Sequence, residues 1–146
     1  MIMKKHPRVV ITRTIPEAGI ALLQKKKYEL VFNEQNKALT KKQLLRFVSG
    51  ADAVLSLLTD DIDKEVFSAA GPQLKIVANY AVGYDNINLA DAQKFGVVVT
   101  NTPGILTHSV AEHAMALTMA CAKRLVEADT FTRHEKYKGW EPMLFL

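Results

Sequence analysis

The 146-residue sequence predicts an α/β fold built on a five-stranded parallel sheet. Short apolar runs alternate along the chain with segments of helical periodicity, and strands separated by helices pair in parallel through right-handed crossovers. The apolar runs show little alternation with polar residues, which is typical of strands covered on both faces. With 49% apolar and 23% charged residues, the chain can fill such a core. Its length corresponds to about one domain.

Each strand and helix of this fold can be placed on the sequence. The strands are expected where the apolar runs lie, at residues 8–12, 28–32, 52–58, 74–79 and 97–100. The helices between them are expected at residues 16–26, 40–50, 63–72 and 88–96. Thr40 and Gln43 have the spacing of a capping box, which predicts a helix start at that point. Gly50, Gly71 and Gly96 stand where helices commonly stop.

The residues from about Thr107 to Lys136 have the pattern of one long helix. Ser109 and Glu112 have capping-box spacing near its start. Between Val110 and Ala122 nearly every residue is apolar, and helices that are apolar all round are buried all round. A five-stranded domain cannot cover so much of one helix, so we expect another domain or subunit to pack on it. We therefore divide the chain at residues 1–105 and 106–146.

Composition argues against several classes of function. The net charge is +4, and the lysine clusters lack the interleaved aromatic and glycine residues that would favour nucleic-acid binding. The single cysteine, Cys121, excludes an internal disulfide and indicates a reducing compartment, so we expect a cytoplasmic protein. The most apolar stretch is far too short for a membrane span. His108 and His113 lie five residues apart and share no helix face, so we expect no metal site.

The stretch LKIVANYAVGYDNI, residues 74–87, contains the most informative loop. In open parallel sheets ligands bind beyond the carboxyl ends of the strands, and this loop follows the fourth strand. Glycine at position 83 suggests a backbone position that tolerates no side chain, where the amides of residues 81–83 could bind a carboxylate. The alternative is an ordinary turn in which Asp85 or Asn86 bonds to its own backbone. Spacing alone favours the turn, since short motifs discriminate weakly.

Two aspartates after the third strand, Asp60 and Asp61, could be phosphoacceptor or metal-binding residues. A receiver-like domain would also have acidic residues after the first strand and a lysine after the fifth, where this sequence has TRT and NTPG. We therefore interpret the two aspartates as the start of the next helix, where the helix dipole favours them. No G-x-G-x-x-G loop for a dinucleotide occurs anywhere in the sequence.

The residues from Leu74 to Asp129 resemble the N-terminal, catalytic domain of the D-isomer-specific 2-hydroxyacid dehydrogenases, and the resemblance extends from about Val9 to Leu146. The stretches TRTIPEAGIALL, ADAVLSLLTDDID and YKGWEPMLFL are similar to the glyoxylate/hydroxypyruvate reductase branch. The resemblance implies a flavodoxin-like, doubly wound substrate domain, which a long helix joins to a Rossmann domain for NAD or NADP. The reaction it implies is hydride transfer between NAD(P)H and a small 2-oxo acid.

The resemblance also implies roles for particular residues. The main-chain amides of Val82 and Gly83 would bind the substrate carboxylate, and the missing side chain of Gly83 would make room for the substrate. Leu57 and Leu58 would line the apolar side of the substrate pocket. Val82 and Val110 would lie against the nicotinamide end of the cofactor.

The remaining parts of such an enzyme are expected beyond residue 146: the catalytic arginine, glutamate and histidine, and the phosphate-binding glycine loop. We therefore expect a chain that ends before its NAD(P)-binding domain, forms a homodimer through the helix at residues 109–135, and is inactive alone. One alternative is a non-catalytic, dimerising flavodoxin-like module. Another is a different member of the family, such as a phosphoglycerate dehydrogenase.

Overall fold

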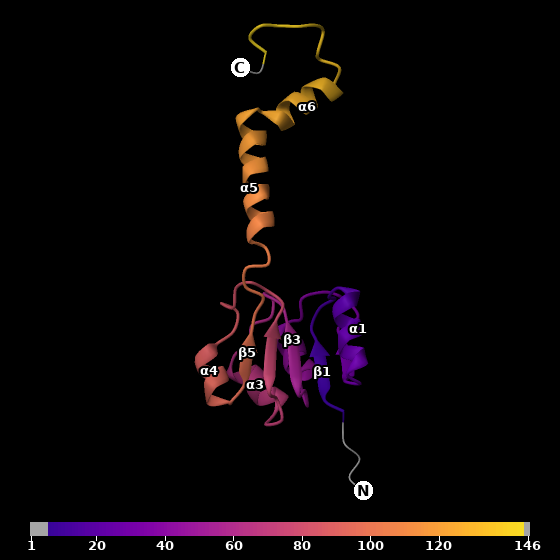
Figure 1. Cartoon of the computed structure of the whole chain (residues 1–146), viewed down its shortest axis with the longest axis vertical. Helices are drawn as coiled ribbons and strands as arrows, with labels where there is room; N and C mark the ends of the chain where they lie inside the picture. Colours follow the sequence, from indigo (N-terminus) through magenta and orange to yellow (C-terminus); the bar gives the residue numbers. More distant parts are fainter. Residues whose placement is uncertain (1–5, 145–146) are drawn as a thin grey trace. The chain divides into compact units, whose positions relative to one another are not determined.

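A computed structural model describes residues 6–144 of the chain (Figure 1). The chain forms two compact units, of which the first ends at Pro103 and the second begins at Gly104. The strands of the first unit are β1 (Arg8–Ile11), β2 (Glu29–Phe32), β3 (Ala53–Ser56), β4 (Ile76–Asn79) and β5 (Val98–Thr100). Its helices are α1 (Glu17–Lys25), α2 (Lys41–Phe47), α3 (Lys64–Ala70) and α4 (Leu89–Lys94). The second unit contains α5 (Thr107–Ala122) and α6 (Leu125–Arg133).

The five strands form one parallel sheet in the order β2-β1-β3-β4-β5. This is the flavodoxin-like order of a doubly wound sheet, so the predicted fold class is confirmed. Val10 pairs with Val54, and Val54 pairs in turn with Val77. All three side chains are buried, because they point to the same covered face of the sheet.

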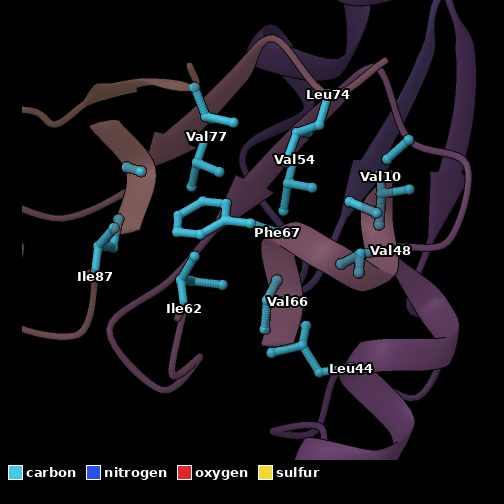
Figure 2. Close-up of a cluster of buried hydrophobic side chains, with 14 residues drawn as sticks. Val10, Leu44, Val48, Val54, Ile62, Val66, Phe67, Leu74, Val77 and Ile87 are labelled. Atoms are coloured by element: carbon cyan, nitrogen blue, oxygen red, sulfur yellow. The ribbon is translucent and has the colours of Figure 1, made fainter. Parts of the chain in front are cut away.

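Helices α2, α3 and α4 cover that face and enclose the main core. Phe67 of α3 is 1% exposed and lies among Val54, Ile62 and Val77 in the close-up of the core (Figure 2). Its ring also packs against Phe95, with the ring centroids 5.7 Å apart and the planes tilted by 33°. Leu44 and Val48 from the α2 segment complete the cluster at its other end. Burial of these apolar groups is the main force that holds α2, α3 and α4 on the sheet.

The opposite face of the sheet is covered by α1 alone among the helices of the first unit. Val9 and Ile11 form a second core there, against Leu23 of α1. The cover does not reach the far strands: Ile76 of β4 is only half-buried, and Val98 of β5 is 58% exposed. A mainly apolar cavity of about 400 Å³ opens on this face, between α1 and the strands β3 and β4.

The capping box at the start of α2 is confirmed. The backbone N–H of Thr40 donates to Gln43 Oε1 over 2.9 Å, and the backbone N–H of Gln43 donates back to Thr40 Oγ1 over 3.4 Å. Helix α3 is capped by Asp63, whose carboxylate accepts from the amides of Glu65 and Val66. Lys41 Nζ lies 2.7 Å from Asp63 Oδ1, so one aspartate both caps α3 and links it to α2.

The single long helix predicted for the second unit is wrong, because the backbone breaks between α5 and α6. Arg124 adopts the left-handed conformation with φ 48°, and no glycine or proline marks this point in the sequence. The predicted box of Ser109 and Glu112 does not form, since α5 already begins at Thr107 and has no side-chain cap. Residues 145 and 146, the last of the terminal YKGWEPMLFL stretch, lie outside the described residues.

The predominantly apolar surface of α5 is not covered by the other described residues of the second unit, and neither α5 nor α6 contains a buried residue. Six apolar side chains of the two helices are each more than half exposed: Val110, Met115, Leu117, Met119, Leu125 and Val126. Across residues 6–144 no helix combines the length and the apolar character that crossing a bilayer requires.

Candidate functional site

The loop after β4 is held in place by hydrogen bonds that its carbonyl groups accept. Ala81 O accepts from the backbone N–H of Thr102 over 2.8 Å, and Val82 O accepts from Asn101 Nδ2 over 2.8 Å. Gly83 O accepts from Asn79 Nδ2 over 2.9 Å. These partners are close because β4 and β5 pair in parallel, so that the residues just after β5 run beside the loop after β4. Three successive peptide carbonyls thus each accept a hydrogen bond from elsewhere in the first unit.

Two amide groups of the same loop are unpaired, whereas the backbone N–H of Ala81 donates to Asn79 O over 2.9 Å. Within the described residues, the N–H groups of Val82 and Gly83 donate no hydrogen bond to the protein. Val82 is 41% exposed and Gly83 is half-buried, so the loop lies at the surface of the unit. Successive free N–H groups attract anions, and carboxylates form particularly strong hydrogen bonds with them. Of the three amides that the sequence suggested for carboxylate binding, that of Ala81 is therefore already used, and those of Val82 and Gly83 are available.

The expectation that the backbone tolerates no side chain at position 83 is wrong for the chain by itself. Gly83 does not have a positive φ, and a Cβ placed on it would meet only Asp85 Oδ2, at an ordinary 3.6 Å. By contrast, Gly71 has φ 98°, and its added Cβ would lie 2.8 Å from Gln73 Oε1. The described residues therefore do not themselves require glycine at position 83.

The turn alternative is correct in part, because residues 84–87 form a turn in which the backbone N–H of Ile87 donates to Tyr84 O over 2.9 Å. The side-chain bonds that it assumed do not form. Asn86 does not bond to its own backbone: its Nδ2 donates to Asp60 O over 2.8 Å and to Leu57 O over 3.1 Å. Its Oδ1 accepts from Asn79 Nδ2 over 3.1 Å. Asn86 thus joins the loop after β4 to the loop after β3, which carries Leu57 and Leu58. Leu57 is half-buried and Leu58 is 63% exposed.

Asp60 does not start the next helix, so that interpretation is wrong. It is 1% exposed, and its Oδ2 accepts from Thr12 Oγ1 over 2.5 Å and from the backbone N–H of Leu57 over 2.9 Å. Its Oδ1 is buried with no hydrogen-bond partner among the described atoms. Asp61, in turn, is exposed and lies 3.4 Å from Lys41. The helix start predicted for these two residues belongs to Asp63.

The buried bond between Thr12 and Asp60 has a consequence for where a ligand can bind. In sheets of this strand order ligands commonly bind at the carboxyl ends of β1 and β3, where the connections change sides. Here the two side chains close that position, since Thr12 is 0% and Asp60 1% exposed. The unpaired amides of Val82 and Gly83 lie one strand further along, at the end of β4.

The remaining predicted site residue, Val110, belongs to the second unit. It lies on α5 and is 61% exposed, so its association with Val82 remains a prediction. A cavity of about 120 Å³ borders the loop after β4. Its lining residues were not predicted: Tyr84, Leu89, Val99, Thr100 and Asn101.

Sequence reasoning also missed the asparagines that hold the loop, Asn79, Asn86 and Asn101. The one available signal was a polar residue at the end of the apolar run IVAN, which indicates a buried side chain with a specific partner. Asn79 is indeed 2% exposed and also accepts from Ser56 Oγ over 3.0 Å.

The residues also limit which cofactors the chain could hold by itself. Over residues 6–144 no three His, Cys, Asp or Glu side chains are placed to bind one metal ion. Because the 146-residue sequence has no G-x-G-x-x-G loop, the residues that would bind the pyrophosphate of a dinucleotide are not among those described.

Fold and site together define a class of protein: an α/β domain with two unpaired main-chain amides at the carboxyl edge of a parallel sheet. Comparison with protein families is more specific. The model for the catalytic domain of the D-isomer specific 2-hydroxyacid dehydrogenases matches residues 9–138, and the chain belongs to this family.

Individual relatives agree with this assignment. The chain is 50% identical over 141 residues to a glyoxylate reductase of Korarchaeum cryptofilum, covering 96% of this chain but 42% of the relative. Among solved structures, a Thermus thermophilus protein superposes with a TM-score of 0.87 at 37% identity, over 95% of this chain and 44% of that one. The chain also superposes on an NADPH-dependent glyoxylate/hydroxypyruvate reductase from Sinorhizobium meliloti, which was solved in complex with NADP and malonate. The TM-score is 0.68 at 30% identity, over 94% of this chain and 41% of that one. The chain thus spans less than half the length of each of these relatives.

Proposed function

We propose that this chain supplies the substrate-binding part of an NAD(P)-dependent D-2-hydroxyacid dehydrogenase that reduces a small 2-oxo acid such as glyoxylate or hydroxypyruvate. The observation that carries the proposal is the loop after β4, where bound carbonyls leave the N–H groups of Val82 and Gly83 unpaired. The names of the relatives, glyoxylate reductase and glyoxylate/hydroxypyruvate reductase, support the choice of substrate.

The proposed roles follow from the chemistry of each group. The amides of Val82 and Gly83 bind the substrate carboxylate, because hydrogen bonds to a charged acceptor are the strongest that a main chain can donate. Leu57 and Leu58 exclude water from the apolar side of the substrate, and Val82 and Val110 lie against the nicotinamide. A bound NADH or NADPH would supply the hydride. No residue of this chain is proposed as catalytic; we propose that the catalytic arginine, glutamate and histidine are supplied by the cofactor domain.

The two parts of the chain have different proposed roles. Residues 1–105 form the substrate domain, and residues 106–146 form the helical connection and the start of the cofactor domain. The helical segment at residues 109–135 is proposed as the surface of a homodimer, supported by the exposed apolar side chains of α5 and α6. The single cysteine supports a cytoplasmic location.

Sedimentation velocity tests the dimer. We expect the purified chain to sediment as a dimer and a Met115→Glu variant to sediment as a monomer, because a charge in the apolar surface must be desolvated. Met115 is 64% exposed in the isolated chain, so the substitution leaves the monomer's own core intact. A chain that stays monomeric at the concentrations used for NMR would disprove this part of the proposal.

Titration of the 15N-labelled chain with glyoxylate tests the binding site. We expect the amide signals of Val82 and Gly83 to shift together, with a dissociation constant of about 1 mM or weaker. That value corresponds to about 4 kcal/mol, which two hydrogen bonds to a charged group can supply. Acetate, which has the carboxylate but no carbonyl group, should shift the same two amides, and chloride should not. The chain with NADH or NADPH should show no glyoxylate reduction. Turnover would contradict the proposal that this chain binds the substrate but contains no catalytic residue.

A further inference from the structure

We propose that Asn101 is a positioning residue, which aims the amide of Gly83 at the substrate carboxylate by binding the carbonyl on the other side of the same peptide group. This inference rests on the proposed function. Asn101 follows directly after β5, and its Nδ2 donates to Val82 O over 2.8 Å. It does not touch the substrate itself.

The geometry of the peptide group connects these two atoms. Val82 C=O and Gly83 N–H belong to one planar peptide unit, and in a trans peptide they point in opposite directions. No cis peptide bond occurs in the part of the chain that the structure describes. Fixing the carbonyl oxygen against Asn101 therefore fixes the plane of the peptide and the direction in which the Gly83 N–H points.

The neighbouring amide is fixed in the same way by a different donor. Ala81 C=O shares its peptide unit with the N–H of Val82, and Ala81 O accepts from the backbone N–H of Thr102 over 2.8 Å. The two proposed carboxylate donors are thus aimed by two consecutive residues after β5, one through its side chain and one through its main chain. Only the side-chain contact can be removed by an ordinary substitution.

The bond from Asn101 also polarises the peptide group. A hydrogen bond accepted by the carbonyl oxygen strengthens the N–H of the same unit as a donor, by about 10–30% in condensed-phase estimates. Water could supply a similar bond, but a mobile donor would not define the orientation of the peptide plane. We therefore expect the loss of Asn101 to weaken carboxylate binding even where water replaces its amide group.

A matched control exists on the same edge of the sheet. Asn33, just after β2, donates from Nδ2 to Thr12 O over 2.9 Å and to Lys37 O over 2.8 Å. It therefore makes the same kind of contact, an asparagine amide to loop carbonyls, but after the outermost strand on the other side of β1. Asn33→Ala should cost stability in the same way as Asn101→Ala without touching the loop after β4.

The experiment compares glyoxylate titrations of the 15N-labelled chain with those of three variants: Asn101→Ala, Asn101→Leu and Asn33→Ala. Leucine has nearly the shape of asparagine but no donor, which separates the hydrogen bond from simple loss of volume. We expect about tenfold weaker binding in both Asn101 variants, the fold-change for losing one charge-assisted hydrogen bond. Asn33→Ala should bind within about twofold of the original chain.

The site of the change is a second readout, which a merely structural role would not produce. In the Asn101 variants the glyoxylate-dependent shift of Gly83 should fall more than that of Val82, because Thr102 still holds the peptide of Val82. Urea unfolding of all variants measures any general loss of stability, which should be at least as large for Asn33→Ala, which loses two hydrogen bonds, as for Asn101→Ala, which loses one.

The outcomes separate the two levels of the proposal. If both Asn101 variants are folded and bind glyoxylate as well as the original chain, the positioning role is refuted and the proposed function stands. If Asn33→Ala weakens binding as much as Asn101→Ala, the effect is one of stability, and the positioning role is again refuted. If the original chain shows no glyoxylate-dependent shift at Val82 or Gly83, the proposed function itself fails.

Discussion

A methyl group added at Gly83 should affect the stability of the fold and the binding of a carboxylate in different ways. The chain itself leaves room for it, since the nearest neighbour of a Cβ would be Asp85 Oδ2 at 3.6 Å and the backbone has no positive φ. Gly→Ala substitutions at such positions stabilise proteins by about 0.4–1 kcal/mol, because the unfolded chain loses conformational freedom. We therefore expect Gly83→Ala to unfold at slightly higher urea concentration than the original chain.

Carboxylate binding should respond in the opposite direction. The added methyl carbon lies about 2.5 Å from the amide nitrogen of its own residue by standard bond lengths, and so beside any acceptor bound there. Displacing the carboxylate from one of its two amides removes a hydrogen bond to a charged group, about 1.5–3 kcal/mol. This corresponds to a loss of affinity of about tenfold or more.

Urea unfolding and glyoxylate titration of the labelled chain measure the two effects on the same sample. Gly71→Ala is the control, because Gly71 has φ 98° and its added Cβ would lie 2.8 Å from Gln73 Oε1. It should lose about 1–3 kcal/mol of stability from backbone strain. Its affinity for glyoxylate should be unchanged in the folded fraction. Undiminished glyoxylate binding by Gly83→Ala, or a loss of stability comparable to that of Gly71→Ala, would refute the reasoning.

Two further predictions concern the scaffold. In the pair Lys41–Asp63, burial is the largest single influence on each pKa and disfavours the charged form of both groups. It is outweighed by their mutual hydrogen bond and opposite charges, together with two backbone amides at Asp63 and the carboxylate of Asp61 at Lys41. The pKa of Asp63 is therefore lowered and that of Lys41 raised, so the pair stabilises fully between the two unfolded-state values, about 3.9 and 10.4. The contribution of the pair is lost as pH falls through the folded pKa of Asp63 or rises through that of Lys41. Asp63→Asn keeps a capping oxygen, so in urea unfolding it should cost about 0.5–1 kcal/mol at pH 7 and nothing in acid. An equal cost at both pH values would contradict the assignment. Phe67→Ala should lower the free energy of unfolding by about 3–5 kcal/mol in urea titrations, since Phe67 is 1% exposed, and a cost below 1 kcal/mol would mean that the core is not packed as described.

Local patterns in the sequence predicted local structure well. The five apolar runs became the five strands, with ends that differ from the expected ones by no more than two residues. The spacing of Thr40 and Gln43 predicted a cap correctly, because both partners lie within one turn, but the same spacing at Ser109 and Glu112 did not form one. The flavodoxin-like, doubly wound class came from family resemblance, and the order of the strands came only from the structure, since periodicity does not determine which strands become neighbours.

Features that depend on distant partners could not be predicted. Asp60 lies in an acidic stretch that resembles a helix start, but its partner Thr12 is 48 residues away. Asn101 and the carbonyl of Val82 are 19 residues apart and meet only because β4 and β5 are adjacent. The left-handed Arg124 that ends α5 has no glycine or proline to signal it.

The two unpaired amides are backbone atoms, and this affects how such a loop can evolve. Every amino acid except proline carries the same N–H group, so replacing the side chain at position 82 leaves its donor intact. Natural variation at that position can therefore reshape the surroundings of the proposed carboxylate site while both amide donors are kept.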